Sequence, residues 1–352
     1  MSYQICGIQQ VGLGNKDVYS TWKFYRRNLG MDLPIFDEEA KAGLMLPYTN
    51  GQVLSRHAIL ALNFQGGGGL EIWQHKEHVP QEPAFLPELG DTGIFILKFK
   101  AKDIDKLYHQ LKENDVNILS ALTSTPNGLK HFYFEDEQKN ILEAIEAHDW
   151  YADIGLASGG VYGCTIGVSD MDVSINFYAD ILGYDHIVFD ETSAFQDFSG
   201  LPGGKGRFRR VILGHSKNRK GPFADLLGSS QLELIEKIDG DSRKIYADRL
   251  WGDPGFIHLC FDVIGMDDLK QKCLEAGHSF TVDSAGSFDM GEAAGRFCYI
   301  EDPDGTLIEF VETHKVPILK KLNWYLNLRN RPRDKSLPRW MLKAMSWSRV
   351  KD

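Results

Sequence analysis

Four glutamates lie in the middle of apolar runs typical of short strands, and their side chains could bind metal ions or transfer protons. They are Glu71 in LEIW, Glu143 in LEAI, Glu233 in LELI and Glu309 in IEFV. Successive side chains of a strand point to opposite faces, so each glutamate lies on the face opposite its apolar neighbours. A single such glutamate is more often solvated than functional. Four at equivalent positions of a repeat favour a functional role, because carboxylates bind divalent cations and act as general bases.

His258 and Gln10 are the other strand residues with chemical potential. His258 lies in the apolar run GFIHLCF, and Gln10 lies in GIQQVGLG. A buried strand histidine can instead be a core residue bonded to backbone, and a strand glutamine can be a surface residue. Seven further histidines show no metal-ligand spacing, and we interpret them as surface or capping residues: His75, His78, His131, His148, His186, His278 and His314.

The chain contains an internal duplication, which sets where these residues lie. Three pairs of segments match, each pair about half a chain apart: 5–29 with 160–184, 93–117 with 255–279, and 131–148 with 297–314. Together they predict four units that each contain strand, helix and three strands, at residues 5–77, 92–148, 160–238 and 254–314. In units 1 and 3, Asp17 and Asp170 are placed to cap the helix start, and Gly30 and Gly183 to end it.

Composition excludes several classes of protein. The 352 residues allow two or three domains, and 43% hydrophobic with 25% charged residues is ordinary for a soluble globular protein. We see neither an apolar run long enough to span a membrane nor a secretory signal at the start. The five cysteines are scattered without a CxxC pair, which indicates buried thiols in a reducing, cytoplasmic setting.

Charge divides the chain into an acidic body and a basic tail. The net charge is −10, while residues 315–352 hold eleven Lys or Arg against two acids, which leaves about −19 on the body. An acidic body argues against nucleic-acid binding. The tail interleaves Trp324, Trp340 and Trp347 with basic residues, so it could contact a membrane surface. We favour the alternative that it packs on the body in one or two helices, with Trp and Leu filling a groove.

The repeat pattern resembles the vicinal oxygen chelate superfamily of glyoxalase I, bleomycin-resistance proteins and extradiol dioxygenases. The resemblance spans residues 5–314, and its most specific motifs are GIQQVGLGNKD, FYRRNLGM, NFYADILGY, GFIHLCF and YIEDPDGTLIEF. It implies an α+β fold of tandem βαβββ units whose sheets form open-barrel cups. It also implies two glyoxalase-like domains, 1–150 and 159–314, followed by the tail.

In that family a metal is held by the first and last strands of two units. The resemblance places the first-strand positions at Gln10, Ile96, Gly163 and His258, and the last-strand positions at the four glutamates. If unit 1 joins unit 2, each site has three donors. If unit 1 joins unit 4, one site is complete, and the other retains only two carboxylates. The complete set is Gln10, Glu71, His258 and Glu309. We favour this second pairing, because it reproduces the Gln–Glu–His–Glu set of zinc-type glyoxalase I.

The resemblance implies a glyoxalase-like lyase or isomerase that binds vicinal oxygens of a small molecule. Zn or Ni is the favoured metal, with Fe, Mn and Co as alternatives. Glu309 is the first candidate for the proton-transferring base and Glu71 the second. The glyoxalase arginine that grips the glutathione carboxylate corresponds to Gly14, which puts glutathione in doubt. Arg56, Arg209 and Arg210 are candidates for binding an acidic substrate.

Two other functions stay open, as does assembly as a monomer or homodimer. A non-haem iron dioxygenase needs two histidines and a carboxylate, and Gly163 stands where its further histidine is expected. A non-catalytic protein would hold a ligand in the cup, as bleomycin-resistance proteins do. Metal analysis separates these readings, because iron favours the oxygenase and no metal favours the binding protein.

Overall fold

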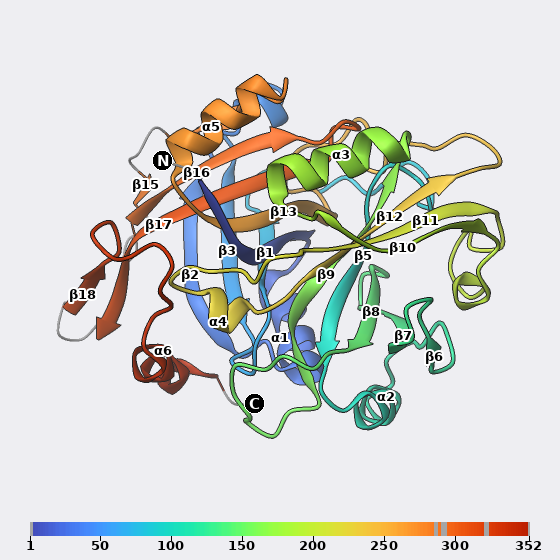
Figure 1. Cartoon of the computed structure of the whole chain (residues 1–352), viewed down its shortest axis with the longest axis horizontal. Helices are drawn as coiled ribbons and strands as arrows, with labels where there is room; N and C mark the ends of the chain where they lie inside the picture. The colour runs from blue at the N-terminus through green and yellow to red at the C-terminus, as the bar shows by residue number, and fades with distance from the viewer. Residues whose placement is uncertain (1–2, 285–287, 290–293, 320–323, 351–352) are drawn as a thin grey trace.

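The computed structural model describes residues 3–284, 288–289, 294–319 and 324–350. These residues form two large curled sheets that lie side by side, with helices packed around them (Figure 1). Units 1 and 2 follow the predicted order of strand, helix and three strands, while unit 3 adds a short second helix and unit 4 has four strands after its helix. The α+β fold of tandem units that form open cups is therefore confirmed.

The strands of units 1 and 4, the first and last units of the chain, form the first sheet. Unit 1 contains β1 (Gln4–Asn15), α1 (Val18–Leu29), β2 (Leu33–Lys41), β3 (Ser55–Leu62) and β4 (Gly69–His75). Unit 4 contains β13 (Gly255–Ile264), α5 (Met266–Glu275), β14 (Val282–Asp283), β15 (Phe288–Asp289), β16 (Ala294–Glu301) and β17 (Leu307–Leu319). Strands β1 and β13 pair antiparallel at the centre of the sheet.

The strands of units 2 and 3, the two middle units of the chain, form the second sheet. Unit 2 contains β5 (Gly93–Ala101), α2 (Ile104–Glu113), β6 (Thr123–Ser124), β7 (Lys130–Glu135) and β8 (Ile141–Glu146). Unit 3 contains β9 (Ser158–Val168), α3 (Met171–Leu182), β10 (His186–Ser193), β11 (Phe208–Gly214), α4 (Ala224–Leu227) and β12 (Gln231–Lys237). Strands β5 and β9 join the two units antiparallel.

The strand order decides between the two pairings that the sequence left open. The first sheet runs β14-β16-β17-β13-β1-β4-β3-β2, and the second runs β10-β11-β12-β9-β5-β8-β7-β6. Unit 1 therefore shares a sheet with unit 4, and unit 2 with unit 3, as we expected. We call the face that carries Glu71 and Glu309 the first cup, and the face that carries Glu143 and Glu233 the second cup.

The predicted helix ends are confirmed in units 1 and 3. The Asp17 side chain accepts hydrogen bonds from the backbone of Tyr19 and Ser20, and Asp170 accepts one from Val173. Helices α1 and α3 end at Gly30 and Gly183, which are left-handed, with φ of 63° and 68°. Only glycine adopts that conformation without a steric cost.

Helices α1 and α3 tie the two sheets into one core. The hydroxyl of Tyr25 in α1 donates to Asp136 of unit 2 at 2.8 Å, and that of Tyr178 in α3 donates to Asp302 of unit 4 at 2.9 Å. Both tyrosines are buried. The largest apolar cluster accordingly contains residues from both sheets. The two cups are thus held in one packed body.

The tail packs on this body. Strand β18 (Trp324–Asn327) pairs with the end of β17, and a short helix, α6 (Arg339–Met345), follows. Leu328, Leu337 and Leu342 are buried in a cluster with Tyr151 and Leu226 of the body. The expectation that the tail covers the body is borne out for its leucines, although part of it is strand rather than helix.

Two tryptophans of the tail are exposed, contrary to our prediction. Trp340 and Trp347 are 59% and 79% exposed, so the prediction that tryptophans fill the groove is wrong for these two. The side chain of Trp324 lies outside the described residues. Near the chain end, Arg349 binds Asp32 at 2.7 Å, which adds an ion pair between tail and body.

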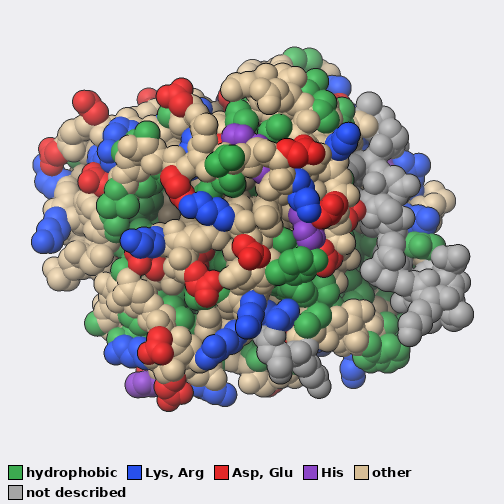
Figure 2. Space-filling view, turned by 180° about the vertical axis from the view of Figure 1, so that it is seen from behind, with side chains coloured by type: hydrophobic (Ala, Val, Ile, Leu, Met, Phe, Trp, Pro, Cys, Tyr) green, Lys and Arg blue, Asp and Glu red, His purple; other side chains and the backbone are tan. Residues whose placement is uncertain are grey.

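Acidic and basic side chains are interspersed on the face opposite the view of Figure 1, as Figure 2 shows. The negative body charge is therefore mixed with basic side chains on that face. Among the helices of the described segments, none is both long and apolar enough to cross a membrane.

Candidate metal centre

Two neighbouring rows of residues cross the strands at the centre of the first sheet. One row contains Glu71, Gly12 and His258, and the other contains Gln10, Cys260 and Glu309. The rows are two residues apart along β1 and β13, and residues two apart on a strand share a face. The four predicted residues therefore lie on one face of the sheet, although the chain separates them widely.

An irregularity in β13 aims the imidazole into the first cup. Gly12 pairs with His258 and Leu13 pairs with Phe256, so Ile257 is an extra residue on one strand. Such a bulge bends the strand and redirects its side chains. A Cβ at Gly12 would lie only 2.7 Å from Nδ1 of His258. The missing side chain at this position thus leaves the space that the imidazole fills.

The four side chains meet at short distances. Nε2 of His258 lies 3.0 Å from Oε2 of Glu309 and 3.5 Å from Oε2 of Glu71. The amide Nε2 of Gln10 donates to Oε2 of Glu71 at 3.3 Å. One ligand atom each from Glu71, His258 and Glu309 lies within 4.8 Å of the others. All four side chains are buried, so the structure brings together the whole predicted set.

Several of these atoms lack a well-aligned hydrogen bond. Oε1 of Gln10 is buried without a hydrogen-bond partner, and the buried Nε2 of His258 and Oε2 of Glu309 face each other at 3.0 Å without good hydrogen-bond geometry, whereas buried polar atoms are normally hydrogen-bonded. The cluster also holds two carboxylates against one imidazole, and a buried net negative charge is costly without a cation. An oxygen- and nitrogen-binding divalent cation fits both features.

Charge interactions shift the protonation of this cluster. Burial alone would lower the pKa of His258, but Glu309 and then Glu71 outweigh it and raise the pKa to about 9. Burial would raise the pKa of Glu71, but His258 holds it below its usual value. Burial, reinforced by Glu309 and Glu71, raises the pKa of Tyr299 well above its ordinary range. The phenol of Tyr299 is therefore neutral at neutral pH.

Aromatic side chains form the wall next to the cluster. The ring of Tyr299 stands edge-on to His258 at 5.5 Å, and Trp73 packs on Trp251 at 4.1 Å between ring centres. Arg56 lies over Trp73 at 5.1 Å, and its guanidinium binds Glu38 at 2.7 Å. Of the predicted arginines, Arg56 is therefore the one beside the first cup.

A cavity of about 320 Å³ adjoins this wall. Its lining includes Trp251 and Ile257 together with Tyr48, Tyr246 and Arg249. None of the four clustered residues lines it. The cavity is thus a neighbour of the candidate centre and not the centre itself.

The other two predicted arginines lie on β11 of the second sheet. Arg209 binds Asp172 and Asp190 at 2.8 and 2.9 Å on a partly exposed surface. Arg210 is buried, binding Glu233 and also Asp197, the latter at 2.7 Å. The structure therefore does not bring Arg209 or Arg210 to the first cup.

The second cup repeats the two rows with different residues. One row contains Glu233, Thr165 and Ile96, and the other contains Gly163, Lys98 and Glu143. Nζ of Lys98 lies 2.6 Å from Glu233 and 2.9 Å from Glu143. Nδ1 of His131 adds a contact of 2.6 Å to Glu143. The chain's own cations therefore neutralise both carboxylates. A lysine two residues after Ile96 was the sequence signal for this arrangement.

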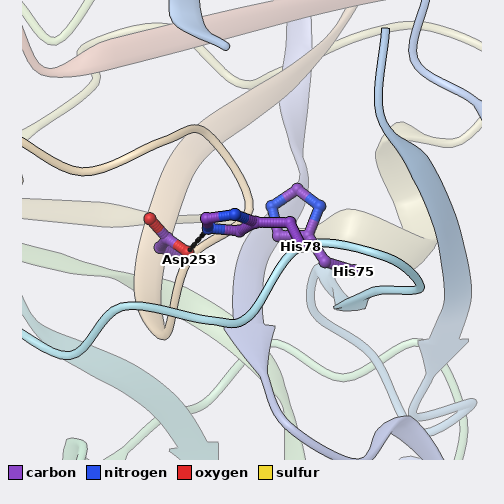
Figure 3. A group of neighbouring side chains, drawn as sticks. All are labelled: His75, His78 and Asp253. Carbon is purple, nitrogen blue, oxygen red and sulfur yellow. Dashed lines mark hydrogen bonds and ion pairs between the residues drawn. The ribbon is translucent and has the colours of Figure 1, made fainter. Parts of the chain in front are cut away.

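A second cluster of potential ligands lies outside both rows. Ligand atoms of His75, His78 and Asp253 lie within 4.8 Å of one another (Figure 3). His75 is therefore not a surface residue, and our interpretation of it was wrong. The signal in the sequence was the spacing of the two histidines at the end of a strand. Asp253, far along the chain, had no such signal.

Comparison with known proteins agrees with this architecture. The sequence model of the Glyoxalase/Bleomycin resistance protein/Dioxygenase superfamily matches residues 7–144 and 162–310, well over half of the chain. No curated protein sequence matches. Among solved structures, glyoxalase I from Zea mays is similar with 14% identity and a TM-score of 0.53, over 88% of this chain and 92% of that chain. A Bacillus subtilis protein with a provisional dioxygenase assignment has 14% identity and a TM-score of 0.58, over 88% and 86%. At 14% identity, the similarity to these two structures supports a shared fold and says nothing about activity.

Proposed function

Because the chain belongs to the Glyoxalase/Bleomycin resistance protein/Dioxygenase superfamily, we propose that it is a metal-dependent, glyoxalase-like lyase or isomerase. Gln10, Glu71, His258 and Glu309 would hold the divalent metal ion, with Zn or Ni favoured. One observation carries the proposal. The outermost units place two carboxylates and an imidazole within 4.8 Å of one another in a buried site.

The second cup supports this assignment by contrast. There Lys98 lies between the two carboxylates at the equivalent strand positions. In the first cup the residue at the position of Lys98 is Cys260, a neutral thiol that supplies no positive charge, and burial raises its pKa well above the usual value so that it does not ionise to a thiolate. Glu71 and Glu309 thus lack the lysine that Glu143 and Glu233 share, and His258 is the basic side chain that contacts both carboxylates of the first cup. An external cation would take the role of that lysine.

A bound divalent ion would act as a Lewis acid toward two adjacent substrate oxygens. The chain itself would move the proton. Glu309 is the favoured base because its Oε2 contacts only Nε2 of His258, at 3.0 Å, whereas Oε2 of Glu71 also accepts a hydrogen bond from Gln10. The neutral hydroxyl of Tyr299 lies 3.5 Å from Nδ1 of His258 and would help to orient the imidazole.

The substrate would be a small molecule other than a glutathione adduct. The position of the glutathione-binding arginine is Gly14, and a Cβ there would overlap the backbone carbonyl of Asp253. The linker around Asp253 therefore fills the space where that arginine would begin. The neighbouring wall of Trp73, Trp251 and Tyr299 favours a substrate with an apolar or aromatic part.

Metal content tests the site. We expect one equivalent of metal in the first cup that is lost in Glu309→Gln and His258→Gln, measured by elemental analysis after dialysis. Glu143→Gln is the matched control, because Glu143 occupies the same strand position in the second cup. Equal metal loss in the control and in Glu309→Gln would contradict the assignment.

Turnover tests the reaction. The metal-loaded chain is assayed with 2-oxoaldehydes and a panel of thiols, and separately with catechols under oxygen-electrode readout. Isomerisation that disappears in Glu309→Gln supports the proposal. Oxygen uptake with bound iron would instead favour the dioxygenase, and tight ligand binding without turnover would favour a binding protein.

A further inference from the structure

We propose that His75, His78 and Asp253 form a second divalent-cation site, which fastens the linker around Asp253 to the end of strand β4. The three side chains come from two segments that lie far apart in the sequence. Figure 3 shows His78 directed at the Asp253 carboxylate, with His75 beside it. Ligand atoms of all three lie within 4.8 Å of one another, and His75 and Asp253 are buried.

The hydrogen bonds of His75 leave one ring nitrogen unsatisfied. Nε2 faces the carbonyl oxygen of Trp251 at 3.1 Å, while Nδ1 is buried without a partner. If Nε2 carries the proton, the lone pair of Nδ1 has no donor. If Nδ1 carries it, an N–H is buried unbonded and the lone pair of Nε2 faces a carbonyl oxygen. A cation that binds one nitrogen removes the conflict, because the other nitrogen then serves as the oriented outer group.

The Asp253 carboxylate is held in place before any ion binds. Its Oδ1 accepts from the backbone N–H of Gln81 at 3.1 Å, and its Oδ2 accepts from that of Leu250 at 2.7 Å. Nε2 of His78 lies 2.9 Å from Oδ1. Carboxylates that bind metals are commonly oriented by such outer hydrogen bonds. The geometry therefore needs little rearrangement to accept an ion.

Two imidazoles and one carboxylate select a borderline ion such as Zn²⁺, Co²⁺ or Ni²⁺ rather than Mg²⁺ or Ca²⁺. The site would be distinct from the first cup. His75 follows Glu71 by four residues on β4, a span of about 13 Å along an extended strand, and Trp73 lies between them. Two ions would therefore bind independently.

A bound ion would fix the position of the linker around Asp253. A Cβ at Gly252 would lie 2.8 Å from Nε2 of His75, so the linker passes directly over this ring. The backbone of Asp253, in turn, fills the space at Gly14 beside the first cup. An ion on Asp253 would hold the linker where it closes that side of the cup.

The test uses the full chain with the first cup disabled by His258→Gln and Glu309→Gln. Co²⁺ is added, and the visible absorption of bound Co²⁺ is followed. We expect one Co²⁺ per chain, and at least a tenfold weaker affinity when His78→Gln is added. His57→Gln is the matched control, because His57 forms a similar pair with Asp37 at 2.6 Å but belongs to no cluster of three potential ligands among the described residues. It should leave the affinity unchanged.

If the chain with the disabled first cup binds no Co²⁺, the proposal is wrong, and the three side chains only connect the linker to β4 through hydrogen bonds. If the disabled chain does not fold, metal per wild-type chain decides. Two equivalents that fall to one in His78→Gln support the second site. A single equivalent that Glu309→Gln removes and His78→Gln retains overturns it and leaves the proposed function intact. A single equivalent that His78→Gln removes and Glu309→Gln retains supports the second site and contradicts the metal site proposed in the first cup.

Discussion

Lys98 occupies in the second sheet the position that Cys260 occupies in the first. Lys98 pairs with Glu143 and Gly163, and Cys260 pairs with the equivalent Glu309 and Gln10. One cup therefore contains a built-in cation, while the other contains a neutral thiol at the same place. The second cup thus has a lysine shared by Glu143 and Glu233, and Glu71 and Glu309 have no lysine at the equivalent position.

Replacing Lys98 is expected to destabilise the fold without emptying the first cup. Lys98→Met leaves Glu143 and Glu233 buried without their shared partner, and breaking a buried pair costs about 3–5 kcal/mol. Urea unfolding measures the loss, and elemental analysis should show unchanged metal. Lys102→Met is the control, because the pair of Lys102 with Asp153 is partly exposed and should contribute little. Equal unfolding midpoints for the two variants would contradict the role of Lys98.

Gly12 is expected to control metal affinity through the space that it leaves. In Gly12→Ala the new methyl group meets the His258 ring, since a Cβ would lie 2.7 Å from Nδ1. Displacing a ligand's ring should weaken metal binding about 10- to 100-fold, the usual effect of changes around a metal site. A competition titration with a chelator measures this. Gly43→Ala, where nothing lies within 4 Å of the added methyl, should bind as the wild type does. An unchanged affinity in Gly12→Ala would refute the steric argument.

Asp262 is expected to make stability fall as the pH rises. Burial raises the pKa of Asp262 to about 7, against the opposite effect of hydrogen bonds with Cys6 and Gln9. Since the folded-state pKa exceeds the unfolded value of about 3.9, the stabilising contribution is complete below that value. It is lost as the pH rises through about 7, at up to about 1.4 kcal/mol per pH unit.

Urea unfolding across this pH range tests the expectation. Asp262→Asn keeps the shape of the side chain but cannot ionise, so its unfolding free energy should lack this component of the slope. Identical slopes for the wild type and Asp262→Asn would show that Asp262 ionises normally.

The tail is expected to contribute to stability through its leucines and not through its exposed tryptophans. Leu342 is 1% exposed in the cluster with Leu33 and Leu226, and Leu→Ala in such a position costs about 2–5 kcal/mol. Trp347, at 79% exposed, should tolerate Ala with little change. Thermal melting distinguishes the two. A larger loss for Trp347→Ala than for Leu342→Ala would contradict this packing.

Much of the site could be predicted by combining the duplication with the family resemblance, which indicated the strand positions of the ligands. Once unit 1 is aligned with unit 3 and unit 2 with unit 4, Glu71 and Glu309 fall at repeat-equivalent strand positions, and His258 stands where its counterpart is Ile96. The alternation of a strand places such residues on a defined face, which is local information. The arginines were less predictable, because Arg209 and Arg210 are neighbours whose side chains point to opposite faces of β11.

The cluster of His75, His78 and Asp253 could not be predicted from local sequence patterns. Two of its members are close in sequence, but the third arrives on a linker whose course depends on how β13 joins β1. The occupation of the second cup by Lys98 is similar, because a lysine in an apolar strand is ordinarily expected to reach solvent.

By itself, the sequence determined the four repeated units, their helix ends and the equivalence of the strand positions, because these depend on short-range periodicity and capping. Only the tertiary structure decided that β1 pairs with β13, that Lys98 lies between Glu143 and Glu233, and that Asp253 meets His75. Those contacts depend on long-range strand register and on the burial of charge, which no local pattern records.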